Sequence, residues 1–384
     1  MTKIEILFLC TNVCAKNIFF NLTMNYSLVQ KKITIFTTSL KKNCSRMSQK
    51  VNIKDLALKA GLSITTVSRV LNGKAEQYRI GKKSQEKVMA IANSLNYTPN
   101  QFAANLKSGR SRTVALVVPS LNNPFFARIV CSINKEIRKF NYLTIIIDSD
   151  ENPEIEKTEL RQLTSRNIEG LIIVPCGDNG RHLQKLNEQG FPVVCIDRYF
   201  EGIDISYVST DNYNGAFRAT SLLIESGHKK IACLQGVQQS MPNRLRVKGY
   251  MDAMQKAGIS ESYVVGDDFS IQNGYLETKL LLKKKNRPTA IFSLGNPIAM
   301  GCMKAFVEEN ICVPDDMSLI TFDDHPYLDY LSTPLSCIAQ PIADITKIAV
   351  KFLFSKIDND EIPTKQILIK PEIKLKKSIC RISG

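Results

Sequence analysis

The sequence lacks the spacings that common enzyme sites require. Histidine occurs only three times, at positions 182, 228 and 325, and the sequence places no nucleophile next to a base. The zinc-protease spacing H-E-x-x-H, the phosphate-binding spacing G-x-x-x-x-G-K-S/T and a G-x-G-x-x-G after the first predicted strand are all missing. We therefore expect a protein that is not an enzyme and that uses no cofactor.

Cysteine spacing indicates neither a zinc site nor a disulfide framework. The eleven cysteines are scattered and odd in number, and no C-x-x-C pair occurs. Cys10 and Cys14 have neither a second pair nor histidines at ligand spacing, so we expect no bound metal. Scattered, reduced thiols are typical of a cytosolic protein, and we expect a cytoplasmic location.

No apolar run is long enough to cross a membrane. The runs at 6–9 and 18–20 fall well short of the about 20 residues that a bilayer-spanning helix needs, and no signal peptide with a cleavage site is evident. We therefore expect no membrane partner. Met47 directly precedes the first motif. This leads to the hypothesis that translation begins there and that residues 1–46 are an extension that is not translated.

Negative charge is scarce in the first third of the chain. Up to Arg112 there are 19 lysines and arginines against four aspartates and glutamates, whereas the remainder has 32 of each kind. The whole net charge of +15 therefore lies in this first part. A basic module on a neutral body is typical of a phosphate-binding head, because neutralised phosphates release their counterions. A basic surface that serves only solubility is the alternative.

Apolar spacing between residues 51 and 97 predicts three short helices. The first stops at Gly61, Ser63 is a good cap for the second, and the third opens near Ser84. The inward faces consist of Ile53, Leu56, Ala57 and Ala60, then Val67, Val70 and Leu71, then Val88, Ile91, Ala92 and Leu95. Two helices joined by a tight glycine turn and backed by a third form a helix-turn-helix, although a plain three-helix packing unit has the same spacing.

The second helix turns a different set of residues outward. Ile64, Thr65, Ser68 and Arg69 project from the face opposite the core. If this helix lies in the major groove of DNA, the arginine can donate two hydrogen bonds to a guanine. The spacing therefore makes these side chains candidates for reading base edges.

Two stretches carry a family resemblance. Residues 53–57, IKDLA, and 61–73, GLSITTVSRVLNG, closely resemble the head of LacI/GalR-type transcription regulators. The resemblance runs from about Val51 nearly to the C-terminus. It implies a helix-turn-helix domain at 51–97 that contacts double-stranded operator DNA. The residues implied in this contact are Ile64, Thr65, Ser68, Arg69 and Asn72.

The segment after the third helix is short and basic. Beyond Pro99 only about two helical turns fit before the next glycine, and a helix below roughly 12–15 residues barely forms alone in water. The resemblance implies that 98–112 is a hinge helix and linker, with Ala103 and Leu106 at the DNA and the leucine wedged between base pairs. A flexible linker is the alternative. Ala104 departs from the family, in which an arginine is frequent there.

From Thr113 onward, apolar strands alternate with amphipathic helices. Near-continuous apolar strands separated by helices indicate parallel sheets covered on both faces. The predicted strands lie at 114–118, 143–147, 170–174, 193–196, 231–234, 290–293 and 319–322. They are too many for one compact sheet. We therefore predict a small all-α helix-turn-helix domain followed by an α/β domain at 113–384, with two doubly wound parallel-sheet lobes as in type I periplasmic binding proteins.

Polar and aromatic residues follow several of these strands. Ligands of such sheets bind beyond the carboxyl ends of the strands. Carboxylates and guanidinium groups suit vicinal sugar hydroxyls, and aromatic rings cover the apolar face of a sugar. The resemblance to periplasmic sugar-binding proteins implies an effector site of Asn123, Phe125, Phe126, Asp197, Arg198, Arg244, Phe269, Asp323 and Gln340. Where the family has an asparagine this chain has Gly295, so Asn296, one place later, is the candidate there. Taken singly, each residue also fits a core, ion-pair or turn role.

These features together predict a transcription regulator whose operator affinity is controlled allosterically by a small molecule, most simply a sugar. A two-fold operator requires a homodimer. The tail after Lys370 has no leucine heptads, so we expect no added tetramer-forming coiled coil. The alternative is a sugar-binding transport receptor with no DNA role, which would predict export and no DNA affinity.

The Leu106→Ala substitution tests the hinge interpretation. A side chain wedged between base pairs contributes only at the kinked operator. We therefore expect the substitution to weaken specific operator binding at least tenfold and to leave non-specific binding nearly unchanged. Titrations with operator and with scrambled DNA measure both. Equal losses on the two DNAs would show that the segment is only a linker.

Overall fold

The structure is a computed structural model, and it describes residues 51–97, 110–359 and 363–382. Two compact units make up the protein, one that contains the helices before residue 98 and one that contains everything from residue 110 onward. The predicted hinge residues Ala103 and Leu106 lie outside the described residues, as does the extension 1–46, so the predicted domain boundaries stay predictions. No helix in the described ranges is long and apolar enough to cross a membrane.

The N-terminal unit consists of the three predicted helices. They are α3 (Ile53–Ala60), α4 (Ile64–Leu71) and α5 (Lys82–Ser94). Asn52 and Asp55 form a capping box at the start of α3, and Gly61 ends this helix in the left-handed conformation with φ of 61°. Ser63 Oγ accepts a hydrogen bond from Thr66 N at 3.1 Å and so begins α4, as the sequence predicts.

One small apolar core holds these helices together. Its buried members come from all three helices and the loop between α4 and α5: Leu56, Ala57, Ala60, Val67, Val70, Ala75, Val88 and Ala92. Four residues that the sequence places in the core are only partly buried against it: Ile53, Leu71, Ile91 and Leu95. The face of α4 that carries Ile64 and Thr65 is exposed, so the core leaves the predicted reading surface uncovered.

The C-terminal unit has two lobes, each built on a six-stranded sheet. The first sheet has the order β11-β5-β4-β3-β1-β2, and all of its neighbouring strands are parallel. Its strands are β1 (Thr113–Val118), β2 (Leu143–Asp148), β3 (Gly170–Ile173), β4 (Val193–Ile196), β5 (Ser206–Thr210) and β11 (Gln366–Ile369). Its helices are α7 (Pro124–Arg138), α8 (Pro153–Ser165), α9 (Arg181–Glu188) and α14 (Ile342–Asp358).

The second sheet has the order β12-β10-β9-β8-β6-β7, with only β12 antiparallel to its neighbour. Its strands are β6 (Ile231–Leu234), β7 (Tyr263–Val265), β8 (Ala290–Ser293), β9 (Ser318–Phe322), β10 (Ser336–Ala339) and β12 (Glu372–Lys374). The helices of this lobe are α10 (Asn212–Glu225), α11 (Met241–Lys256), α12 (Ile271–Leu282) and α13 (Asn296–Glu308), and a short 3-10 helix, η1 (Pro326–Asp329), follows β9.

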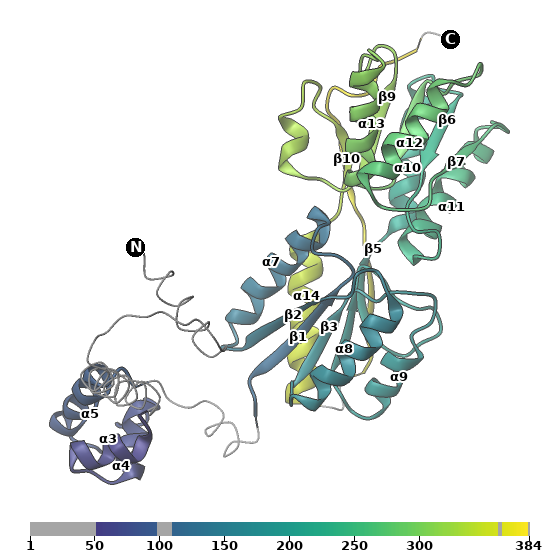
Figure 1. The fold of residues 1–384 in the computed structure, drawn as a ribbon. Helices are drawn as coiled ribbons and strands as arrows, with labels where there is room; N and C mark the ends of the chain where they lie inside the picture. The colour runs from purple at the N-terminus through teal and green to yellow at the C-terminus, as the bar shows by residue number, and fades with distance from the viewer. Residues whose placement is uncertain (1–50, 98–109, 360–362, 383–384) are drawn as a thin grey trace, which may run out of the picture. The chain divides into compact units, whose positions relative to one another are not determined.

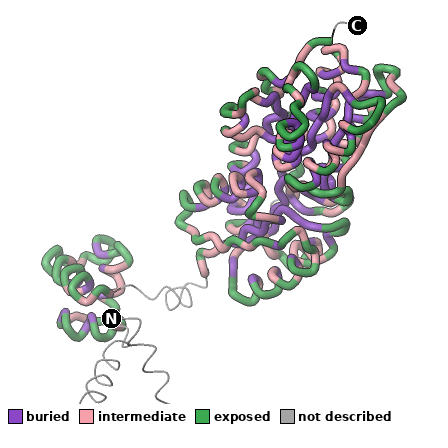
Figure 2. The backbone as a smooth tube through the Cα atoms, turned by 45° about the horizontal axis from the view of Figure 1, so that its top comes forward, coloured by how far each residue is buried: buried purple, intermediate pink, exposed green. Residues whose placement is uncertain are grey.

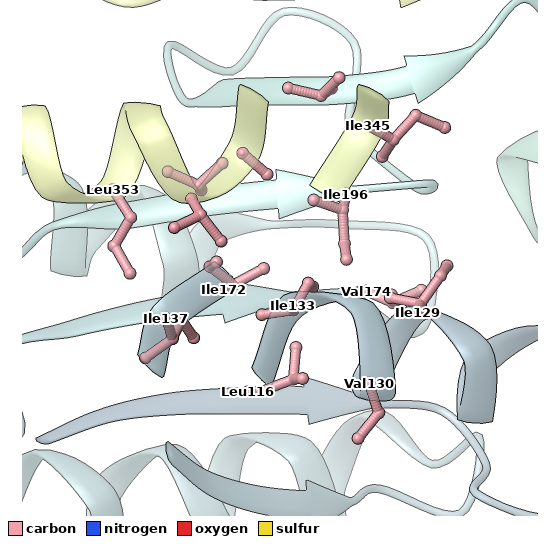
Figure 3. Packing of buried hydrophobic residues seen from close by; sticks show 14 of the residues in the cluster. Leu116, Ile129, Val130, Ile133, Ile137, Ile172, Val174, Ile196, Ile345 and Leu353 are labelled. Carbon is pink, nitrogen blue, oxygen red and sulfur yellow. The ribbon is translucent and has the colours of Figure 1, made fainter. Parts of the chain in front are cut away.

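Helices cover both faces of each sheet, as Figure 1 shows. In the first lobe, α7 and α14 pack on one face through an aliphatic cluster that includes Leu116, Ile133, Ile172 and Leu353 (Figure 3). In both lobes the buried residues gather along the central strands, whereas the edge strands are partly exposed (Figure 2). A sheet that is buried on both faces explains the near-continuous apolar strands of the sequence.

The chain passes between the lobes after β5, after β10 and between β11 and β12. Each lobe is therefore assembled from separate segments of the sequence, and the predicted fold class, a helical head followed by two parallel-sheet lobes, is confirmed. The sequence did not reveal β5, β7, β10, β11 and β12. These strands are short or mix polar with apolar residues, so their pattern resembles a loop.

Leu56 and Leu58 provide a matched test of the head's core. Both are leucines on α3, but Leu56 is fully buried whereas Leu58 is 85% exposed. Leu56→Ala should cost the head about 2–5 kcal/mol, because it removes buried methyl groups and leaves a cavity. Leu58→Ala should change its stability by less than about 0.5 kcal/mol. Hydrogen exchange of the α3 and α4 amides in the full chain measures both, and equal losses of protection would contradict this packing.

Candidate ligand cleft and nucleic-acid interface

A cleft lies between the two lobes, at the carboxyl ends of their strands. Both lobes contribute to its lining, which consists of Asn123, Phe125, Phe126, Asp197, Arg198, Ser240, Pro242, Arg246, Phe269 and Asp323. All of these were expected from the sequence except Ser240, Pro242 and Arg246. This is the position that the carboxyl-end rule for parallel sheets predicts.

The aromatic side of the cleft is fixed by the start of α7. Asn123 caps this helix by accepting a hydrogen bond from Phe125 N at 3.0 Å, and Pro124 occupies the first helical position. Phe125 and Phe126 are buried and meet edge to face, with ring centroids 5.3 Å apart. On the other side, Phe269 lies so close to Gly236 that a Cβ there would be 2.5 Å from the ring. The aromatic residues therefore hold fixed positions.

Arg246 is the buried cation at the centre of the cleft. It lies on α11 and is 3% exposed. Its Nε donates to Asn212 Oδ1 at 2.8 Å, one terminal nitrogen donates to Leu294 O at 2.7 Å, and its guanidinium lies 3.7 Å from the centroid of the Phe322 ring. Burial lowers the pKa of Arg246, whereas the carboxylates of Asp323 and Asp197 raise it. The arginine is thus stabilised by carboxylates from both lobes through their charge, without a direct ion pair to either within the described residues.

Asp197 is the carboxylate that the first lobe contributes, directly after β4. It is 3% exposed and has a left-handed backbone with φ of 61°. Burial raises the pKa of Asp197 to about 6, although Arg246 and Arg198 lower it. Its Oδ1 atom has no hydrogen-bond partner in the described structure, and neither does Ser240 Oγ, which also lines the cleft. Buried polar atoms normally have hydrogen-bond partners, so a ligand in the cleft can supply the missing partners of these two atoms.

Asp323, directly after β9, is the carboxylate of the second lobe. Gln340 Nε2 donates to its Oδ1 at 2.6 Å, and Thr210 Oγ1 in turn donates to Gln340 Oε1. Gln340, which the sequence places in the site, therefore does not line the cleft but positions Asp323. Because Thr210 ends β5 in the first lobe, this chain of hydrogen bonds also joins the two lobes.

Arg198 is held by a partner that the sequence did not suggest. Its two terminal nitrogens donate to the two carboxylate oxygens of Glu151, one of them at 3.1 Å. Such a paired contact fixes the guanidinium plane. The guanidinium carbon lies 5.7 Å from the centroid of the Phe126 ring. The Asp197-Arg198 dipeptide is thus not a surface ion pair, because each residue has its own buried environment.

Two predicted residues lie outside the cleft lining. Arg244 is exposed and donates to Gln239 O at 2.8 Å, so the arginine of the cleft is Arg246 and not Arg244 as predicted. Two residues that are two positions apart on a helix are rotated by about 200° around its axis, so the side chains of Arg244 and Arg246 point to opposite sides of α11. Asn296 is 1% exposed at the start of α13, its Oδ1 has no partner, and it is not among the lining residues.

On the head, the predicted reading face of α4 is largely open. Ile64 is 45% exposed, and Thr65 is exposed beside it. Arg69 stacks its guanidinium 3.6 Å above the ring of Tyr78, which leaves the donor edge of the arginine uncovered. Asn72 ends the helix and donates to Ser68 O at 2.8 Å. Ile64, Thr65 and Arg69 therefore lie on one helix, and Asn72 caps its end. The contact of Asn72 with DNA stays a prediction.

The raised pKa of Asp197 predicts a pH-dependent stability. Its carboxyl ionises near pH 4 in the unfolded chain but near pH 6 in the folded one, so the folded state loses stability as pH rises between these values. Asp197→Asn removes this contribution. Relative to the wild type, the variant should gain on the order of 2–3 kcal/mol in free energy of unfolding between about pH 4 and 6. Urea unfolding across this range measures it, with the exposed Asp315→Asn as control. A constant difference would contradict the buried environment of Asp197.

Family comparisons agree with both parts of the chain. Residues 111–374 match the family model of periplasmic binding proteins and sugar binding domain of LacI family, and residues 52–100 match that of bacterial regulatory proteins, lacI family. The ribose operon repressor of Haemophilus influenzae is 32% identical over 85% of this chain and 98% of that protein. The transcriptional regulator DegA of Bacillus subtilis is 33% identical over 77% of this chain and 88% of that protein.

Solved structures show the same architecture. A lac repressor dimer bound to operator and to the anti-inducer ONPF has a TM-score of 0.77 and 25% identity, and the match covers 86% of this chain and 100% of that chain. A ribose-bound LacI family regulator from Enterococcus faecium has a TM-score of 0.65 and 26% identity, with 71% of this chain and 100% of that chain covered. The helical head, the two-lobed body and the matches to both family models lead to one conclusion: this chain belongs to the LacI family of bacterial regulatory proteins.

Proposed function

We propose that this protein is a transcription regulator that binds a specific DNA operator as a homodimer and responds to a sugar bound in the interlobe cleft. The main support is the cleft, which is lined by two buried carboxylates, two buried arginines and fixed aromatic rings. The same chain also has a DNA-binding head. Regulation of DNA requires access to it, so we also infer a cytoplasmic location.

The chemistry of the cleft supports a sugar. Asp197 and Asp323 supply acceptors, Arg246 and Ser240 supply donors, and the phenylalanines offer apolar faces. Vicinal hydroxyls each donate and accept, so they can satisfy the unpartnered Asp197 Oδ1 and Ser240 Oγ together. A purely apolar ligand would leave these atoms unsatisfied, at a cost of about 1–3 kcal/mol each.

The head supports recognition of specific DNA sequences. Its helix α4 exposes Ile64, Thr65 and the edge of Arg69 on one surface, and the preceding helix is capped and packed independently of that surface. A short helix with this exposure fits the major groove. The proposed DNA contacts are made by Ile64, Thr65, Ser68, Arg69 and Asn72 in the major groove, and by Ala103 and Leu106 of the hinge at the operator centre.

The coupling follows from where the cleft lies. Because both lobes line it, a bound ligand favours one separation of the lobes over another. In a dimer, the lobe positions set the distance between the two hinges, and two-turn helices form only at the right distance. A differential affinity of this kind shifts operator binding by about 1–3 kcal/mol in typical allosteric systems. A transport receptor without a DNA role would give no purpose to residues 52–100, which match the DNA-binding family model.

Arg69 tests the DNA reading. Arg69→Ala in the full chain should weaken binding to the operator from the protein's own upstream region by about 10–100-fold, because a paired arginine–guanine contact contributes roughly 1–3 kcal/mol. It should also relax the base preference at one position in each half-site. Fluorescence anisotropy on a set of single-base operator variants measures both effects.

The control is Arg287→Ala, an exposed arginine in the body of the protein, which should leave operator binding unchanged. Binding of the wild type should fall steeply with salt concentration, because phosphate contacts release counterions. If the wild-type protein binds its upstream region no better than scrambled DNA at any salt concentration, the proposed function is wrong.

A further inference from the structure

A second, larger cavity adjoins the cleft. It has a volume of about 330 Å³, within the range of roughly 300–1,000 Å³ typical of small-ligand sites. The loops that follow β3 and β4 in the first lobe form most of its wall, and Gln239, Met241 and Arg244 of the second lobe complete it. Arg244, which was predicted to contact the effector, therefore lines this cavity and not the cleft.

The cavity and the cleft are neighbours along one short segment. Met241 and Arg244 line the cavity, whereas Ser240, Pro242 and Arg246 line the cleft. The segment at the start of α11 thus contributes side chains to both spaces. Arg198 lines both of them. A ligand that fills the cleft and continues past Arg198 would enter the cavity.

The cavity has the mixture of surfaces that a sugar ring uses. Tyr199 is stacked on Tyr207 with centroids 3.9 Å apart, so its ring is fixed. Phe200 packs against Gly180, where a Cβ would lie 2.3 Å from the ring. The lining also contains the amides of Asn179, Gln184 and Gln239, which donate and accept, the acceptors Asp178 and Glu201, and the donor Arg181. Rings and planar polar groups together suit a hydroxyl-rich ring.

The charges of the lining nearly cancel. Glu151 neutralises Arg198 through a paired contact, so two arginines, Arg181 and Arg244, remain against Asp178 and Glu201. Within the described residues Arg181 has no hydrogen-bond or ion-pair partner and Arg244 donates only to a carbonyl, so their donors are available. A phosphate site would concentrate positive charge. This balance favours a neutral group.

The cleft and the cavity also differ in whether they have room for a ligand in this structure. The cleft encloses only about 20 Å³, room for about one water molecule, so a ligand can enter it only when the lobes separate. The cavity is already open and is built mostly from one lobe. Resting on the proposed function, we propose that the effector is a neutral oligosaccharide of at least two units, with one ring in the cleft and the next ring in the cavity.

The test compares sugars of two lengths on the full-length protein. Isothermal titration is carried out with glucose, galactose, xylose and ribose, and with maltose, cellobiose, lactose and xylobiose. At least one disaccharide should bind at least tenfold more tightly than either of its component monosaccharides. Arg244→Ala and the cavity-filling Asn179→Trp should lower the ratio of disaccharide to monosaccharide affinity toward one. Asp197→Asn should weaken both sugars and preserve the ratio, and Arg287→Ala serves as the matched control for the lost arginine.

Each remaining outcome would overturn the inference in a recognisable way. If a monosaccharide binds as tightly as every disaccharide, or if Arg244→Ala and Asn179→Trp leave the ratio unchanged, the cavity is not a sugar subsite and the cleft remains a sugar site. If glucose 6-phosphate or ribose 5-phosphate binds more tightly than all neutral sugars, the neutral class is wrong. If no saccharide binds, the sugar effector of the proposed function fails as well, while operator titration still tests the DNA role separately.

Discussion

The burial of three charged groups close together, Arg246 with Asp197 and Asp323, is the constraint on which the ligand site depends. All three side chains are at most 6% exposed, and removing a charge from water is costly unless opposite charges and hydrogen bonds replace the hydration. The arginine and one aspartate come from the second lobe, and the other aspartate comes from the first. The opposite charges therefore offset part of the cost of burying one another, and they couple the electrostatics of the two lobes.

The hydrogen-bonding capacity of these buried groups is only partly satisfied, and this allows the site to bind a ligand. Gln340 and Thr210 complete the contacts of Asp323, but Asp197 Oδ1 and Ser240 Oγ are left without partners among the described residues. Burial raises the pKa of Asp197 to about 6, a sign that its ionised form is under-solvated. A hydroxyl-rich ligand that donates to this carboxylate would replace the missing hydration and favour the lobe positions that allow the contact.

The sequence predicted the elements whose apolar residues repeat or alternate. It did not predict features that depend on the rotation of a helix about its axis or on the conformation of a loop. Apolar runs such as 114–118 marked the central strands, and the polar residues after them marked the cleft, because parallel strands end at one edge. The choice between Arg244 and Arg246 depends on how α11 is rotated against the sheet, and apolar spacing did not reveal that rotation. β5, with the sequence SYVST, alternates too weakly to be recognised. The second cavity is formed by loops whose conformation no local pattern specifies.

A ligand between the lobes and an operator on the head should influence each other's binding. Thermodynamic linkage requires that the influence be reciprocal. The most direct measurement is therefore the affinity of the full-length protein for its tightest-binding saccharide, determined once with free protein and once with protein saturated by operator DNA. We expect the two affinities to differ at least fivefold, and by the same factor by which the saccharide changes operator affinity. Equal saccharide affinities in the two states would show that the cleft and the head are not coupled.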